Sequence, residues 1–207
     1  MGDTDAASAN TQNLTEIICS LESCCAAALE SESLKRFGEG IAYRKKAEIF
    51  YQLACSYSEN SCSDEKVEKL HRDNVYGIGS DLLRLNRYRE ALEYAQANCG
   101  STAREQILLG VCCAHSVKNY PKAFLLLRAA DSDGIEIDSW MLTAALYMLT
   151  FFYREAPHIT GLKNGMQRAY QCVLRASEKS GEVGEWGNKE LLKYSKNASG
   201  EYEYSDK

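Results

Sequence analysis

Apolar residues recur along this chain at the spacing of α-helices. Within residues 13–35 they follow one another at intervals of three or four, which places them on one stripe of a helix. The same interval predicts further helices over residues 41–58, 64–85, 88–98, 102–117, 120–130, 138–153, 166–179 and 187–195. No segment alternates apolar and polar residues over a sustained length, so we expect no sheet. The pattern predicts an all-α protein of eight or nine helices joined by short loops.

Changes in composition suggest where the helical part begins and ends. Residues 1–12 are polar and acidic, and we expect them to be disordered. Residues 13–196 are expected to fold as a single domain. Within it, the sequence RFGEG at 36–40 is expected to end the first helix, because a basic last turn followed by glycine is a common helix stop. Residues 197–207 form a polar tail, whose Tyr202 and Tyr204 are either disordered or add a short segment to the surface or to another subunit.

Four of the predicted helices share a pair of small positions seven residues apart. Seven residues are about two helical turns, so both positions lie on one face and let a second helix approach closely. Three copies have alanine at both positions, and the fourth has Ala91 followed by Asn98; the alanine pairs are Ala47 and Ala54, Ala123 and Ala130, and Ala169 and Ala176. Helical hairpins of this kind cannot bury their faces alone and are expected to stack on one another.

The helix before each of the last three copies carries its own spaced pattern. Its members are Val75, Ile78, Gly79 and Leu82; Gln106, Leu109, Gly110 and Cys113; and Trp140, Thr143, Ala144 and Tyr147. This pattern resembles the tetratricopeptide (TPR) repeat, in which a large residue, a small pair and a tyrosine mark the first helix. The copies are 44, 32 and 46 residues apart, whereas strict TPR arrays repeat at about 34. Variable spacing is typical of the related Sel-like repeats, and residues 161–181 look like the second half of that unit. The resemblance covers about residues 45–180.

The resemblance implies a fold and a binding mode. The fold would be a right-handed α-solenoid of about four antiparallel helical hairpins, a TPR-like superhelix whose first helices line a concave groove. The inward positions would be Tyr76, Ser80, Leu83 and Arg84 in the Ala91 repeat, and Arg104, Ile107, Val111 and His115 in the Ala123 repeat. This mixture of aromatic, aliphatic and cationic groups suits an extended or helical peptide of some acidic character.

The function expected from this groove is non-enzymatic protein–protein interaction, as an adaptor or scaffold for a peptide or partner domain. The alternative is a structural homo-oligomer, such as a homodimer, that associates through the faces of the solenoid. In a short array the inward positions can also be covered by the N-terminal helix or by the last helix of the same chain.

Charge and hydropathy exclude several other partners. The formal net charge is −5 and no run of basic residues is present, so we expect no nucleic-acid partner. The longest uncharged run, residues 139–153, has 15 residues, fewer than the roughly 20 needed to span a bilayer, so we expect no membrane partner. The first dozen residues do not resemble a secretory signal. Nine cysteines, an odd number with two adjacent pairs, fit free buried thiols in a cytoplasmic protein.

No catalytic motif is visible, and we expect neither an enzyme nor a cofactor. The sharpest alternative chemistry is a metal site, because Cys112 and His115 lie one helical turn apart and Cys62 and His71 could complete a zinc site. Against it, the chain has no Cys-x-x-Cys motif, and Cys112 or Cys113 falls on the expected core face. We therefore predict no metal, with His115 capping the inner face of its helix.

Overall fold

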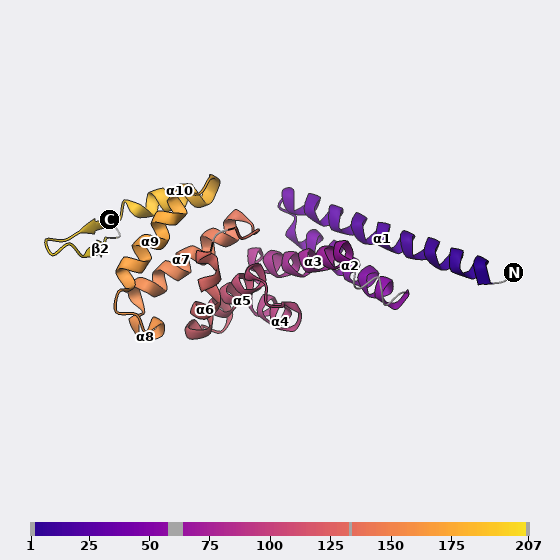
Figure 1. The fold of residues 1–207 in the computed structure, drawn as a ribbon, viewed down its shortest axis with the longest axis horizontal. Helices are drawn as coiled ribbons and strands as arrows, with labels where there is room; N and C mark the ends of the chain where they lie inside the picture. The colour runs from indigo at the N-terminus through magenta and orange to yellow at the C-terminus, as the bar shows by residue number, and fades with distance from the viewer. Residues whose placement is uncertain (1–2, 58–63, 133, 206–207) are drawn as a thin grey trace. The chain divides into compact units, whose positions relative to one another are not determined.

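The computed structural model describes residues 3–57, 64–132 and 134–205. These residues form ten α-helices, one 3₁₀ helix and two short strands, so the all-α class predicted from the apolar spacing is confirmed. Their contacts divide the chain into two compact units, Met1–Cys99 and Gly100–Lys207. Figure 1 shows the helices of each unit. None of the described helices is long and apolar enough to cross a membrane.

The first unit is built from α1 (Asp3–Ser33), α2 (Phe37–Tyr57), α3 (Glu65–Arg84) and α4 (Tyr88–Asn98). Each helix packs against the next one along the chain. Between α1, α2 and α3 lies a cluster of buried side chains that includes Leu21, Ala47 and Val67, and the partly buried Phe50 and Leu70 pack against it. The carboxylate of Asp64 caps α3 by accepting a hydrogen bond from the backbone N–H of Lys66 at 2.9 Å.

Helix α1 differs from the sequence-based expectation at its start. It begins at Asp3 and so includes residues 3–12, which we expected to be disordered. This segment contains three alanines and neither glycine nor proline, and alanine has the highest intrinsic helix propensity.

The RFGEG segment also behaves differently from the prediction. Helix α1 ends at Ser33, and Lys35 makes the turn with a positive φ of 59°. Helix α2 begins at Phe37, so Gly38 and Gly40 lie inside it and do not precede it. A Cβ atom at Gly40 would lie 3.0 Å from the carboxylate oxygen Oδ2 of Asp81. This glycine therefore serves close packing inside a helix.

The second unit holds the other helices and both strands. These are α5 (Ala103–Ser116), α6 (Tyr120–Leu127), the 3₁₀ helix η2 (Arg128–Asp131), α7 (Ser139–Glu155), α8 (Pro157–Thr160), α9 (Gly165–Ser177), α10 (Gly181–Leu191), β1 (Tyr194–Lys196) and β2 (Tyr202–Tyr204). Helix α5 packs against α6, and α7 against α9, while α10 contacts both α7 and α9. The Phe124 ring of α6 meets Phe152 and Tyr153 of α7 edge-on, with centroids 6.3 and 5.6 Å apart.

The prediction that the chain has no strand is wrong at one place. Strands β1 and β2 pair antiparallel, with Tyr194 opposite Tyr204, inside a segment that the sequence assigned partly to the last helix and partly to the tail. The hairpin is held to its unit by its tyrosines. The Tyr204 hydroxyl donates a hydrogen bond to the Glu190 carboxylate at 2.8 Å, and the Tyr202 ring stacks on Tyr170 at 3.9 Å. The tail tyrosines thus add a short segment to the surface of their own unit.

The paired alanines are buried, as their spacing predicted. All of them, together with Ala91, are at most 1% exposed, whereas Asn98 is exposed; the pairs are Ala47 and Ala54, Ala123 and Ala130, and Ala169 and Ala176. The burial expected for most cysteines also holds in the described part of the chain, where five of the seven free thiols are buried: Cys24, Cys25, Cys112, Cys113 and Cys172. Cys55 departs from that expectation because it is disulfide-bonded.

Helix α10 begins six residues earlier than the predicted helix at 187–195. Gly184 and Gly187 lie inside it. A Cβ atom at Gly187 would lie 2.4 Å from the backbone nitrogen of Ser177, and one at Gly184 would lie 1.9 Å from the carbonyl oxygen of Lys179. The glycines therefore allow α10 to lie directly against the end of α9. Their low helix propensity obscured the helix in the sequence.

Candidate binding groove

An open groove of about 670 Å³ in the second unit is lined by α5, α7 and α10. Helix α7 supplies most of its floor from one face, because the lining positions recur at intervals of three and four; they are Trp140, Thr143, Ala144, Tyr147 and Met148. The opposite face of α7 is buried and includes Met141, Leu146 and Leu149. Packing of that buried face on the core thus turns the aromatic face of α7 toward the groove.

The two other helices complete the walls of the groove. Helix α10 contributes Glu182 and Trp186, one turn apart, and α5 contributes His115 from its last turn. The close contact of Gly184 and Gly187 with α9 determines where these α10 side chains lie. The surface is mostly apolar, and Tyr147 remains 52% exposed. An accessible concave surface with aromatic side chains and a few polar groups is a typical binding site for a peptide or another ligand.

Two titratable groups set the charge of this groove near neutral pH. Partial burial lowers the pKa of the His115 imidazole below its ordinary value of 6.5, so the ring is neutral at pH 7. Glu182 lies in the first turn of α10 and is exposed. Because the other lining side chains are uncharged at this pH, the lining carries one negative charge.

The four inward positions predicted in the Ala91 repeat lie on α3 in the first unit. Tyr76, Ser80 and Leu83 are buried, so their side chains are not exposed for a partner. Arg84 is exposed, and its guanidinium lies over the Phe37 ring, 4.9 Å from the ring centroid.

The four positions predicted in the Ala123 repeat lie on α5 in the second unit. Ile107 and Val111 are buried, and Arg104 is partly exposed near the start of the helix. Only His115, of the eight predicted residues, lines the groove on α5, α7 and α10.

Most residues of this groove were not among the predicted inward positions, although the sequence contained a signal for them. Trp140, Thr143, Ala144 and Tyr147 are the four positions of the TPR-like pattern that precedes Ala169, in the last repeat. The pattern indicated a repeat, but the predicted inward positions were limited to the two repeats before it. Trp186 had no comparable signal, because its helix was predicted to begin one residue after it.

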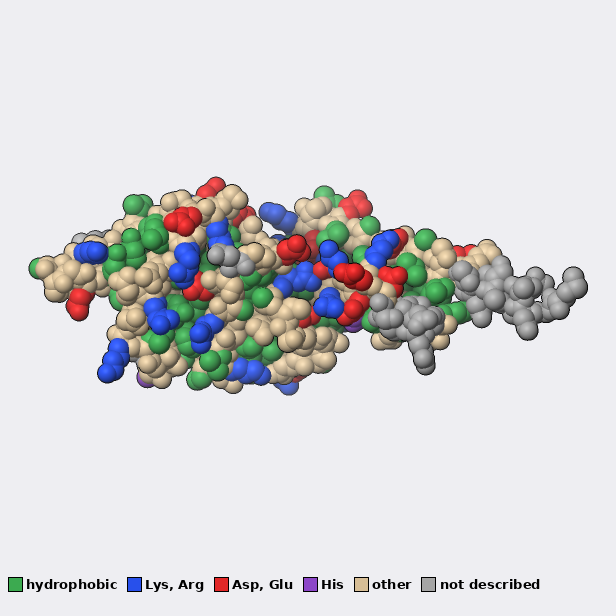
Figure 2. Space-filling model, viewed as in Figure 1, with side chains coloured by type: hydrophobic (Ala, Val, Ile, Leu, Met, Phe, Trp, Pro, Cys, Tyr) green, Lys and Arg blue, Asp and Glu red, His purple; other side chains and the backbone are tan. Residues whose placement is uncertain are grey.

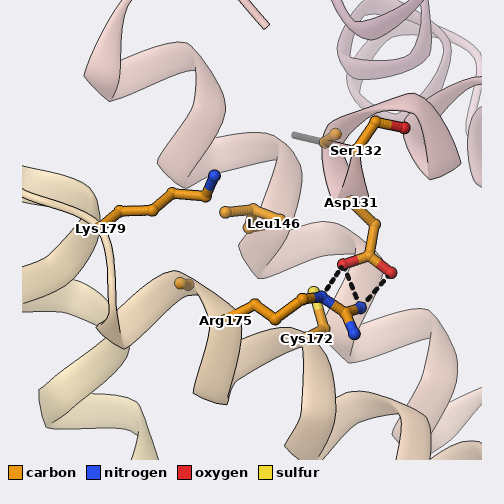
Figure 3. Close-up of a pocket in the computed structure, with 8 residues that line it drawn as sticks. Asp131, Ser132, Leu146, Cys172, Arg175 and Lys179 are labelled. Carbon is orange, nitrogen blue, oxygen red and sulfur yellow. Dashed lines mark hydrogen bonds and ion pairs between the residues drawn. The ribbon is translucent and has the colours of Figure 1, made fainter. Parts of the chain in front are cut away.

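A smaller hollow in the same unit lies between η2, α7 and α9 and has a volume of about 10 Å³. Figure 3 shows the Arg175 guanidinium facing the Asp131 carboxylate, with Cys172 beside it. Arg175 donates hydrogen bonds to Asp131 from Nε at 3.2 Å and from Nη2 at 2.5 Å. Burial, with a smaller contribution from Asp131, raises the pKa of the Cys172 thiol. The thiol therefore stays protonated at neutral pH and is a poor nucleophile.

The residues considered for a zinc site do not form one in the described part of the chain. Cys112 is fully buried in the core of the second unit, whereas the His115 side chain, in the last turn of α5, is only partly covered. His71 belongs to the first unit, where its ring stacks on Tyr51 at 3.9 Å, and Cys62 lies outside the described residues. Among residues 3–57, 64–132 and 134–205, no group of three or more potential metal ligands comes together.

The surface charge offers no obvious cationic face on the side seen in Figure 2. There, the described Lys and Arg side chains either lie among Asp and Glu or are separated from one another by hydrophobic and other groups, and they form no continuous basic area. Comparison with protein-family models, curated proteins and solved structures found no match for this chain. The function proposed below therefore rests on the groove and on the repeat pattern in the sequence.

Proposed function

We propose that this chain is a helical-repeat protein–protein interaction module, an adaptor or scaffold that binds a peptide or partner domain in the α5–α7–α10 groove. In this proposal the repeats are the four hairpins α1–α2, α3–α4, α5–α6 and α7–α9, stacked as a right-handed TPR-like or Sel-like solenoid. The order of the helices and the buried alanine of each second helix support it. In this scheme α10 follows the last hairpin, and its Trp186 extends the surface formed by the first helices α5 and α7.

One observation carries the proposal: both tryptophans of the chain lie in one accessible, mostly apolar groove. Tryptophan and tyrosine are the residues that most often dominate binding energy at protein interfaces. A groove of this size accommodates several side chains of a partner. The proposal also places the protein in the cytoplasm, which the free thiols support and the disulfide of Cys55 opposes.

The test compares proteins captured from a lysate of the source cells by three forms of the chain. These are the wild type, Tyr147→Glu in the groove, and Leu125→Glu as a matched control, since Leu125 is 65% exposed on α6 outside the groove. Circular dichroism first verifies that both variants are folded. We expect a partner that the wild type and the control retain and Tyr147→Glu loses, followed by direct titration with the purified partner. If all three forms capture the same proteins, the groove is not the binding surface.

A second candidate function, self-association, is favoured by a separate feature of the first unit. Ile49, Leu53 and Tyr57 are 58, 41 and 49% exposed and recur every four residues along α2, forming an apolar stripe. Light scattering at micromolar concentration measures the mass of the protein in solution and so detects self-association directly. A doubled mass for the wild type that returns to the monomer mass of 23.1 kDa in Leu53→Glu would favour the homo-oligomer.

A further inference from the structure

The charge of the groove indicates the chemistry of its ligand. Glu182 is the single carboxylate among the side chains that line it, and no Lys or Arg is among them. A ligand that buries its apolar groups here also removes water from around Glu182. An ionised carboxylate covered in this way loses hydration, and a cationic partner compensates for that loss.

The basic residues that suggested an acidic ligand from the sequence do not lie in this groove. Arg84 belongs to the first unit, where it packs on Phe37, and Arg104 is outside the lining. The nearest cation on α10 along the same face is Lys189, seven residues after Glu182. Seven residues correspond to about 10 Å along the helix axis, too far for a direct ion pair.

Resting on the function proposed above, we propose that the α5–α7–α10 groove binds a basic peptide whose apolar side chains contact Trp140, Tyr147 and Trp186 and whose Lys or Arg pairs with Glu182. The aromatic side chains favour the same ligand, because a cation over the face of Trp or Tyr is attracted by the ring. Met148 on the groove floor is flexible and adapts to differently shaped apolar groups. The ligand proposed here is therefore basic, whereas the sequence predicted a peptide of some acidic character.

The tryptophans provide a direct readout for the test. Because Trp140 and Trp186 are the two tryptophans of the chain and both line the groove, intrinsic fluorescence reports its occupancy. The probes are two tryptophan-free amphipathic peptides with the same Leu- and Phe-rich apolar face. One carries Lys and Arg on its polar face, and the other carries Glu and Asp. Each is titrated against the full chain, with calorimetry as a second readout. We expect the basic peptide to bind about tenfold more tightly, a difference of about 1.4 kcal/mol.

Two charge-reversal variants identify the residue responsible. Glu182→Lys is expected to remove the preference for the basic peptide, with a loss of about tenfold in its affinity. Glu185→Lys is the matched control, because it makes the same charge change at an exposed position of the same helix outside the lining. The control is expected to keep the preference within about threefold.

The outcomes separate this inference from the proposed function. Equal or tighter binding of the acidic peptide at the groove overturns the inference and leaves a peptide-binding function standing. An equal loss in both variants assigns the attraction to the general charge of α10 and overturns the role of Glu182. If neither peptide changes the fluorescence or releases heat, both the inference and the groove-binding function fail.

Discussion

At the scale of single residues, the least expected feature is a buried ion pair in the first unit. Arg44 of α2 is 4% exposed, and its Nε donates a hydrogen bond to the Glu32 carboxylate at 2.7 Å. The carboxylate of Asp81, itself buried, lies 3.9 Å from the same nitrogen. Gly77 of α3 makes room for this arrangement, because a Cβ atom there would lie 2.0 Å from the Arg44 guanidinium carbon. Two acidic side chains thus lie beside one buried cation.

This cluster makes stability depend on pH, and Asp81→Asn tests it. Burial, reinforced by the nearby Glu32 charge and only partly opposed by Arg44, raises the pKa of Asp81 from 3.8 to about 8. Between these values the folded state binds more protons than the unfolded state, so stability is highest at the acid end and falls as pH rises toward 8. The slope for one proton is at most about 1.4 kcal/mol per pH unit. Urea denaturation at several pH values should show a smaller decline in Asp81→Asn, whose side chain stays neutral.

The control for Asp81→Asn is a substitution at a carboxylate that is not buried. Glu68 lies on the same helix, is partly exposed and pairs with Arg72. Glu68→Gln is therefore expected to keep the pH dependence of the wild type. If Asp81→Asn keeps it as well, Asp81 is ionised in the folded protein at neutral pH and the argument from burial is wrong.

At the scale of helices and strands, the apolar spacing predicted the helices in the middle of the chain well. Helix α4 was predicted over the residues it occupies, and α3 and α5 to within about one residue at each end. These helices have unambiguous signals at their ends. Helix α5, for example, starts at a capping box in which Thr102 and Glu105 satisfy each other's backbone N–H groups.

The elements that were missed depend on contacts that a local pattern does not contain. Helix α10 keeps two glycines because α9 lies against them, and only the folded structure shows that contact. The β1–β2 hairpin alternates over just three residues in each strand. It is held by Glu190, just before β1, and by Arg154, which lies 40 residues before Tyr194 in the sequence. The groove was predictable in part. The repeat pattern contained four of its five α7 residues, but the contribution of α10 depended on a helix that was predicted to begin too late in the sequence.

The fit of α10 on α9 predicts a strong effect of one added methyl group. In Gly187→Ala, the new Cβ would lie 2.4 to 2.7 Å from backbone atoms of Ala176 and Ser177, which cannot rotate away. Overpacking of this kind costs about 1–3 kcal/mol, and α10 should also move relative to α7. We expect a lower urea midpoint and a shifted tryptophan fluorescence maximum, because Trp186 lies on α10.

A second glycine inside a helix serves as the control for Gly187→Ala. At Gly38 in α2, a Cβ atom would meet nothing within 4 Å. Gly38→Ala is therefore expected to stabilise the protein by up to about 1 kcal/mol, through the higher helix propensity of alanine. A similar loss of stability in both variants would contradict the packing explanation.

The hairpin gives the second prediction at this scale. The Arg154 guanidinium lies 3.7 Å from the centroid of the Tyr204 ring and donates a hydrogen bond to Glu190 at 3.1 Å. Tyr204→Phe removes the hydroxyl that bonds to Glu190 and keeps the ring over Arg154, which should cost about 1 kcal/mol. Tyr204→Ala also removes the ring and should release residues 194–204, with faster amide hydrogen exchange there.

The matched control for the hairpin is Tyr43→Phe, because Tyr43 is exposed on α2 in the first unit. Tyr43→Phe should change the free energy of unfolding by no more than about 0.5 kcal/mol. Unchanged hydrogen exchange in the Tyr204→Ala variant would show that the backbone pairing of β1 and β2 is enough to hold the segment in place.

At the scale of the whole molecule, the division of the chain into two compact units raises the question of whether they unfold together or separately. Each unit has its own buried apolar side chains: a cluster that includes Leu21 in the first, and residues such as Leu146 and Leu149 in the second. The sequence, by contrast, suggested a single domain over residues 13–196. A repeat array of stacked hairpins allows either behaviour, because its cooperativity depends on the strength of the interfaces between neighbours.

The location of the tryptophans makes this question measurable. Both belong to the second unit, so fluorescence follows residues 100–207, whereas circular dichroism follows the helices of both units. Leu21→Ala leaves a cavity in the first unit and should cost about 2–5 kcal/mol. For Leu21→Ala we expect an early unfolding step in the circular dichroism signal, while the midpoint of the fluorescence transition stays unchanged. Leu149→Ala, in the second unit, should instead lower the fluorescence midpoint. If Leu21→Ala shifts both signals together, the two clusters unfold as one cooperative domain, because a cavity in the first unit then destabilises the surroundings of tryptophans that belong to the second.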